Sequence, residues 1–567
     1  MGKRKKVVVV AFILAIVLVL VLVGALIYKK WAPSNVQEDA SKYFKLKDGE
    51  IAILVDDVQI DGTAKKIDGY TYVPTEIASL YMDKRIYVDE LEGVLSYATS
   101  EALIQVKENQ TSFMEGKDPK ETEQPILRKE DKSYYVSLAF IQEHTSNYIQ
   151  EYKNPGRLIV MKDRDKEYTF ATLKEDTRIR KGPGKKYAYW VDATEGERVI
   201  VENGIKMENE YAAVTTEDGI TGYVPEELIQ NKKDEKWSFD KEPEVFKQQK
   251  MSGTICLGWH QVMDETASQS VYSGISSATS MNVISPTFFS LSDNGGNFTS
   301  IADTGYVTQA HAAGKKVWGL VDDFKKGIKL SAILGATSSR TKLINGLVGK
   351  AIQYDLDGIN IDFENVTKDN AAAYLQFLRE LTLKAHVNDL IISVDNYTPA
   401  EYNTYYDLEE QGKIVDYVIL MAYDEHYSGS EESGSVSSIN FVKHGVTSMT
   451  AIVPKERVVV ALPFYTRIWK ETKGKKPEAT AYGMSAAETI VRSHDATAKW
   501  DKETQQYYAE YKDGKITYKV WLEEETSLGK KLDVAKENKV AGYAFWKLGF
   551  ERPATWDTIS KYVKKGS

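Results

Sequence analysis

Apolar runs of strand length alternate with stretches of helical periodicity in the C-terminal part of the chain. This alternation predicts repeated strand–helix units and a parallel α/β fold. The predicted strands span residues 253–259, 281–289, 316–321, 358–364, 390–394, 415–423, 458–465 and 542–546. Eight such strands within residues 250–567 predict a (β/α)8 barrel of the TIM type. The stretch 470–530 is too long for one crossover, and its segment 506–520 is predicted to form a small β insertion.

The N-terminus contains one continuous apolar run instead of alternating strand-length and helical patterns. Residues 7–28 carry no charge and lie between basic residues on both sides. About 20 apolar residues suffice to span a bilayer as a helix, so residues 1–31 are predicted to hold a membrane anchor. A cleaved signal peptide is the alternative, but the run is long for one and has no small-x-small site before Lys29. The basic cluster at 3–6 predicts a single-pass protein of the cell membrane with everything after Trp31 outside the cytoplasm.

Two smaller domains are predicted between the anchor and the barrel, with linkers at 32–47 and 232–249. Residues 48–168 contain two similar units, 69–74 and 132–138, each followed by a helical pattern. This α+β segment resembles the copper amine oxidase N-terminal-like domain, although no copper ligands are evident. Residues 169–231 have short strands with Gly turns, typical of a small β-barrel, and are similar to bacterial SH3-like domains. Binding of cell-wall peptide and a plain spacer role are both open for this domain.

Composition narrows the classes of function. The 567-residue chain has a net charge of −9, which gives no support to nucleic-acid binding. One cysteine, Cys256, excludes an intramolecular disulfide. The seven histidines are scattered and no Cys/His cluster has metal-ligand spacing, so neither a metal nor a cofactor is predicted.

Polar side chains alternate with apolar ones along the predicted strand 358–364. Asn360, Asp362 and Glu364 point to one face, and the residues between them are apolar. Helical patterns at 339–354 and 368–387 flank the strand, which predicts that it is buried and parallel rather than a solvated edge. Glu364 then lies at the C-terminal end of a barrel strand, where such barrels carry out chemistry.

The segment from Asp357 to Glu364 resembles the signature of family 18 glycoside hydrolases, Asp-Gly-x-Asp-x-Asp-x-Glu on the fourth barrel strand. Asn360 departs from the usual Asp, as in the branch that contains spore-cortex lytic and related peptidoglycan-active enzymes. Segments 418–424, 461–467 and 542–546 resemble the sixth, seventh and eighth strands of the family. The common Ser-x-Gly-Gly of the third strand is absent.

The resemblance implies a substrate-assisted, retaining mechanism, an exception among glycosidases. Glu364 would be the acid, and Asp362 would hold the N–H of the substrate's 2-acetamido group. Tyr423 would bind the acetamido oxygen, and Asn360 would be a neutral hydrogen-bond partner of Asp362. Substrate contacts are further implied for Asp357, Met421, Asp424, Tyr465, Arg467 and Trp546.

The sequence therefore predicts a membrane-anchored glycosidase that cleaves β-1,4 bonds after N-acetylglucosamine in peptidoglycan. Chitin or chitooligosaccharide is the alternative substrate. A non-catalytic wall-glycan-binding protein and an envelope interaction protein are two further classes. The presence of Glu364, Asp362 and Tyr423 weighs against both.

Overall fold

The computed structural model describes residues 2–564 and separates into two compact units. The first unit comprises the chain up to Ile86, Glu108–Thr111 and Thr122–Pro243, and the second comprises Tyr87–Lys107, Ser112–Glu121 and the chain from Glu244 onward. This division differs from the predicted boundaries, because most of residues 87–121 belongs with the barrel and not with the 48–168 segment.

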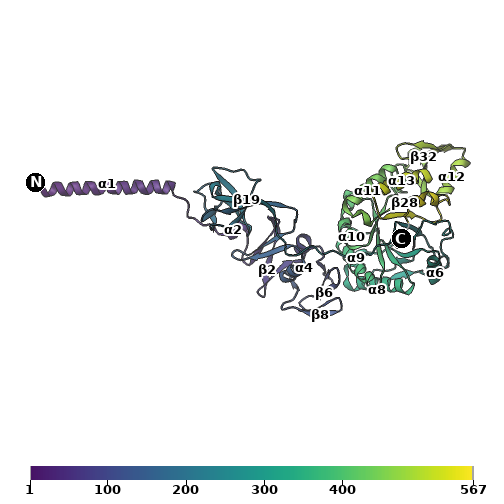
Figure 1. The fold of residues 1–567 in the computed structure, drawn as a ribbon, viewed down its shortest axis with the longest axis horizontal. Coiled ribbons are helices and arrows are strands. Elements are labelled where there is room, and N and C mark those ends of the chain that lie inside the picture. The colour runs from purple at the N-terminus through teal and green to yellow at the C-terminus, as the bar shows by residue number, and fades with distance from the viewer. Residues whose placement is uncertain (1, 565–567) are drawn as a thin grey trace. The chain divides into compact units, whose positions relative to one another are not determined.

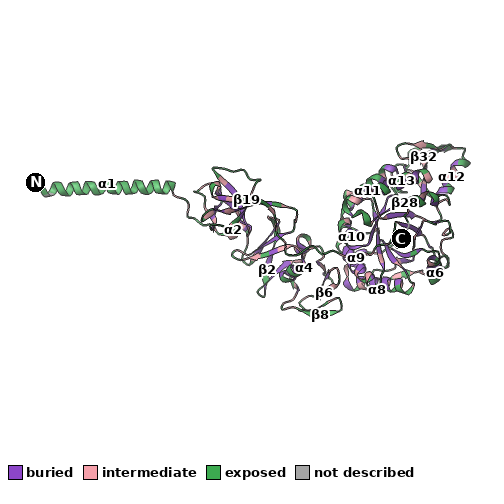
Figure 2. Cartoon of the chain, in the orientation of Figure 1, coloured by how far each residue is buried: buried purple, intermediate pink, exposed green. Residues whose placement is uncertain are grey.

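The N-terminal helix α1 spans Gly2–Trp31 and is exposed along its described side chains, as Figure 2 shows. Its segment Arg4–Trp31 is long and apolar enough to cross a membrane by length and composition. A signal sequence passes the same test, so anchoring stays a prediction.

The first unit contains a seven-stranded sheet in the order β11-β12-β1-β2-β3-β10-β9. The two similar sequence units form its antiparallel neighbours β3 and β10, where Val73 faces Val136, and each strand leads into a helix. The elements of this part are α2 (Ala40–Phe44), β1 (Glu50–Val55), β2 (Val58–Ile67), β3 (Tyr70–Pro74), α3 (Thr75–Ile77), η1 (Ala78–Met82), β9 (Leu127–Glu130), β10 (Ser133–Ser137), α4 (Leu138–His144), β11 (Tyr148–Tyr152) and β12 (Arg157–Met161).

A second seven-stranded sheet, antiparallel throughout, follows in the order β15-β14-β18-β17-β16-β13-β19. Buried aliphatic residues such as Leu173, Val199 and Val214 form its core. A likeness to bacterial SH3-like domains stays a prediction. Its elements are β13 (Glu167–Leu173), β14 (Thr177–Arg180), β15 (Tyr189–Ala193), β16 (Arg198–Val201), β17 (Tyr211–Thr216), β18 (Thr221–Pro225), η2 (Glu226–Leu228) and β19 (Ile229–Lys236).

The second unit is built on a closed parallel barrel, which confirms the predicted fold (Figure 1). Eight strands pair in parallel around the ring, and the β20–β34 and β21–β24 pairings close it. These strands are β20 (Ile255–His260), β21 (Val283–Pro286), β24 (Lys316–Asp322), β25 (Gly358–Asp362), β26 (Ile391–Tyr397), β27 (Tyr417–Met421), β28 (Val458–Pro463) and β34 (Gly542–Trp546). A hairpin of β22 (Phe289–Leu291) and β23 (Phe298–Ser300) extends the sheet beside β24.

Helices surround the barrel, and an antiparallel insertion follows its seventh strand (Figure 1). The helices are α5 (Glu265–Ser268), α6 (Thr304–Ala312), α7 (Leu330–Gly335), α8 (Thr337–Gln353), α9 (Ala371–His386), η3 (Glu401–Tyr406), α10 (Leu408–Ile414), α11 (Ile439–Ile452), η4 (Lys455–Arg457), α13 (Glu525–Glu537) and α14 (Thr555–Ser560). The insertion comprises β29 (Tyr465–Thr472), β30 (Glu478–Gly483), α12 (Met484–Ser493), β31 (Lys499–Asp501), β32 (Gln506–Asp513) and β33 (Ile516–Leu522).

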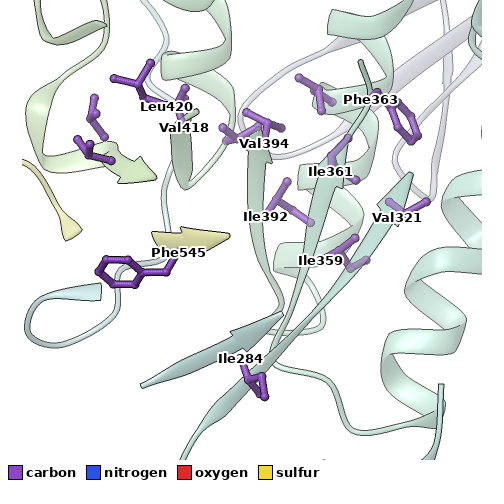
Figure 3. Packing of buried hydrophobic residues seen from close by; sticks show 14 of the residues in the cluster. Ile284, Val321, Ile359, Ile361, Phe363, Ile392, Val394, Val418, Leu420 and Phe545 are labelled. Atoms are coloured by element: carbon purple, nitrogen blue, oxygen red, sulfur yellow. The ribbon is translucent and has the colours of Figure 1, made fainter. Parts of the chain in front are cut away.

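Strand alternation divides the barrel core into two layers. Ile359, Ile361 and Phe363 of the β25 segment point outward and pack in the layer between strands and helices (Figure 3). A separate cluster inside the ring contains Trp259 and Trp318, among other residues. The residue that follows each outward side chain therefore faces the interior, which places Asn360 and Asp362 inside the barrel.

A five-stranded sheet, which we call the arm, packs against the barrel from residues 87–121. Its order is β4-β5-β6-β7-β8, with β4 (Tyr87–Asp89), β5 (Val94–Ala98), β6 (Leu103–Lys107), β7 (Ser112–Glu115) and β8 (Asp118–Glu121). Asp89 accepts a hydrogen bond from the backbone N–H of Thr337 at 2.6 Å, and Glu92 accepts one from Ser338 at 3.0 Å. These are the first two residues of α8, which has no side-chain cap from its own preceding residue. The arm thus supplies the N-terminal cap of a barrel helix.

Candidate active site

Asn360 lies inside the barrel and is fully buried. Its side-chain carbonyl accepts the indole N–H of Trp259 at 2.9 Å, and its amide donates to Ser393 at 3.0 Å and to Asp395 at 2.9 Å. The side chain therefore bridges β20, β25 and β26. Asp362 is not among its partners, so the predicted Asn360–Asp362 hydrogen bond is corrected to a bond with Asp395 on the neighbouring strand. An amide suits this place because it donates and accepts at once.

Asp362 is the last residue of β25, with its side chain inside the barrel. Its Oδ1 atom is buried and has no hydrogen-bond partner among the described residues. Burial holds the pKa of Asp362 well above its usual range, and the charges of Asp395 and Glu364 act in the same direction. An unpartnered buried acceptor is costly, so Asp362 is suited to receive a donor from a ligand.

Glu364 follows β25 and is partly exposed at the carboxyl-terminal end of the barrel. The carboxylate of Asp323 accepts the backbone N–H groups of Glu364 and Asn365, at 3.1 and 3.0 Å, and so fixes this turn. Burial raises the pKa of Glu364, while a hydrogen bond from the Tyr397 hydroxyl to its carboxylate acts in the opposite direction. A carboxyl group with a raised pKa at this position can deliver a proton near neutral pH.

Three of the predicted substrate contacts form one cluster beyond β27 and β28. Asp424 accepts hydrogen bonds from the Tyr465 hydroxyl at 2.7 Å and from Arg467 at 2.9 Å. The Tyr423 ring packs edge-on against Tyr465 with centroids 6.3 Å apart. Burial raises the pKa of Tyr423 well above its usual value, which keeps its hydroxyl neutral and able to donate.

Met421 and Trp546 end two barrel strands at the same carboxyl-terminal side. Met421 is buried at the end of β27 beside Ala461 of β28. Trp546 is half-buried, and its ring lies 5.9 Å from that of Trp259. Trp259 itself is 1% exposed, which makes it a core partner of Asn360 rather than a sugar contact.

Asp357 is not brought to this group of residues. It precedes β25, at the amino-terminal end of the barrel, while the other residues lie at or beyond the opposite ends of their strands. Its carboxylate accepts the backbone N–H of Val317 and pairs with His311 and Lys316. The implied substrate contact of Asp357 is therefore corrected to a structural role at the base of the strand.

Sequence reasoning missed three residues that face the site: Asp323, Asp395 and Tyr397. The predicted strand 390–394 ended too early, since β26 continues to Tyr397. Ser393, Asp395 and Tyr397 alternate with Val394 and Asn396, the pattern that identified Asn360 and Asp362. Continuing the alternation by three residues would have found Asp395 and Tyr397, whereas Asp323 follows another strand, β24. Within residues 2–564, no group of three or more His, Cys, Asp or Glu is arranged to hold a metal ion.

Most of the barrel segment matches the model of a known enzyme family. Residues 309–551 match the family model described as "Glycosyl hydrolases family 18". Residues 309–551 are thus the part of the chain that is similar to this family, and the chain is a glycoside hydrolase.

The relatives of this domain include bacterial glycosylases. "Uncharacterized glycosylase YvbX" of Bacillus subtilis (strain 168) is 26% identical over 300 residues, which cover 50% of this chain and 86% of that protein. "Cortical fragment-lytic enzyme" of the same organism is 29% identical over 237 residues, which cover 40% of this chain and 54% of that protein. The chain thus spans about half the length of the latter relative. The crystal structure of the Bacillus megaterium QM B1551 spore cortex-lytic enzyme SleL is 20% identical, with a TM-score of 0.49, over 58% of this chain and 78% of that one.

Proposed function

We propose that the protein hydrolyses β-1,4 bonds after N-acetylglucosamine in peptidoglycan by a substrate-assisted, retaining mechanism. The observation that carries the proposal is the pairing of Glu364, a partly exposed acid, with Asp362, whose buried Oδ1 atom has no partner among residues 2–564. In this proposal Asp362 accepts a hydrogen bond from the substrate, and Glu364 protonates the leaving oxygen.

Glu364 acts as the general acid. Burial raises the pKa of Glu364, which favours the protonated carboxyl group, and the Tyr397 hydroxyl and the Asp323-anchored turn fix its orientation. It gives that proton to the glycosidic oxygen as the bond breaks. The carboxylate that results then takes a proton from the water that attacks in the second step, which restores the acid.

Asp362 and Tyr423 hold the acetamido group of the sugar whose bond is cleaved. The N–H of that group donates to Asp362, and the Tyr423 hydroxyl donates to the acetamido oxygen. The oxygen attacks the anomeric carbon, the bond to the leaving oxygen breaks, and a positively charged oxazolinium ring forms. A carboxylate at Asp362 stabilises this charge. Water then opens the ring, so that two displacements give net retention.

The remaining residues position the sugar. Trp546 offers a half-buried aromatic face on the end of β34, and Met421 supplies an apolar contact. Asp424 orients Tyr465 and Arg467 through the two hydrogen bonds of their cluster. These three side chains provide polar contacts to sugar hydroxyl and acetamido groups.

Peptidoglycan is the proposed substrate because the relatives include a cortical fragment-lytic enzyme and because an apolar N-terminal helix would hold the barrel near the cell wall. The test is digestion of purified peptidoglycan and of chitin oligomers, followed by reduction of the new ends. New N-acetylglucosamine reducing ends from peptidoglycan support the proposal. New N-acetylmuramic acid ends, or cleavage of chitin alone, contradict it.

A further inference from the structure

A second buried carboxyl group lies beside Asp362 inside the barrel. Strands β25 and β26 are parallel, with Asn360 opposite Ser393 and Ile361 opposite Val394. Asp395 follows on the same face as Ser393, and it is only 3% exposed. Its Oδ1 atom accepts the Asn360 amide at 2.9 Å. The amide thus holds Asp395 toward the interior, next to the end of β25.

The two carboxyl groups have unequal hydrogen-bond partners. Asp395 receives an N–H donor from Asn360, which stabilises its charged form. Asp362 has no such donor at Oδ1 among the described residues. Two neighbouring carboxyl groups in a buried site do not both ionise readily. A single proton, held on Asp362, would leave the one negative charge on Asp395, where the Asn360 amide stabilises it.

The surroundings of the two carboxyl groups are acidic. The charges that act most strongly on the pKa values of Asp362 and Asp395 are negative, and no cation is among them. The pKa of Asp362 is raised by the negative charges of Glu364, of Asp322 at the end of β24 and of Asp323 just after it. The charge of Glu364 also raises the pKa of Asp395. The tyrosines that are affected by the charge of Asp362 are Tyr374 on α9, Tyr397 on β26, Tyr406 on η3 and Tyr423 after β27. Burial and this negative field hold the pKa of Asp362 well above its usual range, and burial and Glu364 do the same for Asp395.

We propose that Asp362 and Asp395 share one proton across β25 and β26, and that Asp395 is a positioning residue that sets the protonation state of Asp362. The inference rests on the proposed function. Asp395 takes the place that an Asp at position 360 could have held, while Asn360, which does not titrate, donates its amide to Asp395.

The shared proton moves when the substrate binds. In the resting state Asp362 is neutral and Asp395 carries the charge. The acetamido N–H requires an acceptor, so the proton passes from the Asp362 carboxyl group to the Asp395 carboxylate. Asp362 becomes the anion that faces the oxazolinium ring, and the net charge of the pair does not change. The proton returns to Asp362 when the product leaves.

The first test is an infrared titration of the protonated-carboxyl band of the full chain, with Glu364→Gln as the background so that the acid itself does not contribute. Replacing Asp395 with Asn removes the neighbouring charge, so Asp362 is expected to lose its proton at a pH at least about one unit lower. Asp362→Asn is expected to lower the midpoint of Asp395 in the same way. Asp416→Asn is the matched control, because Asp416 is a buried carboxyl group that precedes β27 at the other end of the barrel. It should leave the midpoint of the pair unchanged.

The second test measures enzyme kinetics in protein that keeps the native Glu364. Asp395→Asn should lower kcat by roughly 10- to 100-fold, less than the loss of a direct proton donor, and should leave KM nearly unchanged. The pH–rate profile should lose the ionisation that belongs to the pair, which a merely structural defect would not alter.

Unmoved infrared midpoints in both Asp395→Asn and Asp362→Asn would overturn the shared proton even if the enzyme is active. If one variant does not fold, the other decides. Wild-type protein that cleaves no N-acetylglucosamine-containing glycan would contradict the proposed function alone, because the infrared result does not depend on turnover.

Discussion

Replacing Asp89 with alanine is expected to loosen the first turn of helix α8, although the two residues in contact are far apart in the sequence. Asp89 is 2% exposed and accepts the backbone N–H of Thr337 at 2.6 Å. Its loss removes a helix cap, which is worth about 0.5–2 kcal/mol. Because the site is buried, the N–H is also left without an acceptor, which costs about 1–3 kcal/mol. These two figures describe one interaction, so the expected total is about 1–3 kcal/mol.

Hydrogen–deuterium exchange of the full chain measures this effect where it occurs. Amides at the start of α8 should exchange faster by a factor of roughly 5–150, since 1.4 kcal/mol corresponds to about tenfold. Asp89→Asn retains an acceptor oxygen and should lose much less protection. Asp118→Ala removes an exposed acid from strand β8 of the same arm and should leave α8 unchanged.

Unchanged α8 exchange in Asp89→Ala would refute the assignment of the arm as a cap of the barrel. Equal loss in Asp118→Ala would attribute the effect to net charge and not to the hydrogen bond.

Three further predictions concern the site and the anchor. Tyr397→Phe removes the hydrogen bond that favours the charged form of Glu364, so the pKa of the acid should rise and the alkaline limb of kcat/KM should move to higher pH; a shift to lower pH would contradict the assigned interaction. Asp357→Asn should leave KM for peptidoglycan unchanged, because Asp357 lies at the opposite end of the strand, and a clear rise in KM would restore it as a substrate contact. Protease added to intact protoplasts should remove the chain after Trp31, whereas full protection would reverse the proposed topology.

The barrel and the central part of its site follow from local patterns. The alternation of strands and helices over residues 250–567 predicts a parallel fold because each strand must be covered on both faces. The alternation around Ile359 and Ile361 predicts which side chains face the interior, since side chains on a strand alternate between its two faces. Both inferences use only neighbours in the sequence.

Hydrogen bonds between segments that are distant in the sequence could not be predicted from such local patterns. Asn360 bonds to Trp259 on one strand and to Ser393 and Asp395 on another, and these pairings depend on the register of the closed sheet. The local pattern predicts that Asn360 is inside but not which groups it meets.

The arm illustrates the same limit at the level of domains. Residues 87–121 have the short alternating strands of the segment around them, so they were predicted to share its domain. Asp89 and Glu92 lie in a polar stretch that is typical of a turn, so the local sequence does not indicate that they bond to a distant segment. Their bonds to the start of α8 arise only when the barrel exposes N–H groups that its own sequence leaves uncapped.

Turnover by Glu364→Gln, measured beside wild type on purified peptidoglycan, tests the central claim most directly. The glutamine keeps the size of the side chain but cannot donate an acid proton, so the rate should fall by at least about 10² while glycan affinity is retained. New N-acetylglucosamine reducing ends should appear with wild type and not with the variant. Equal turnover by the two proteins would contradict the assignment of Glu364 as the acid.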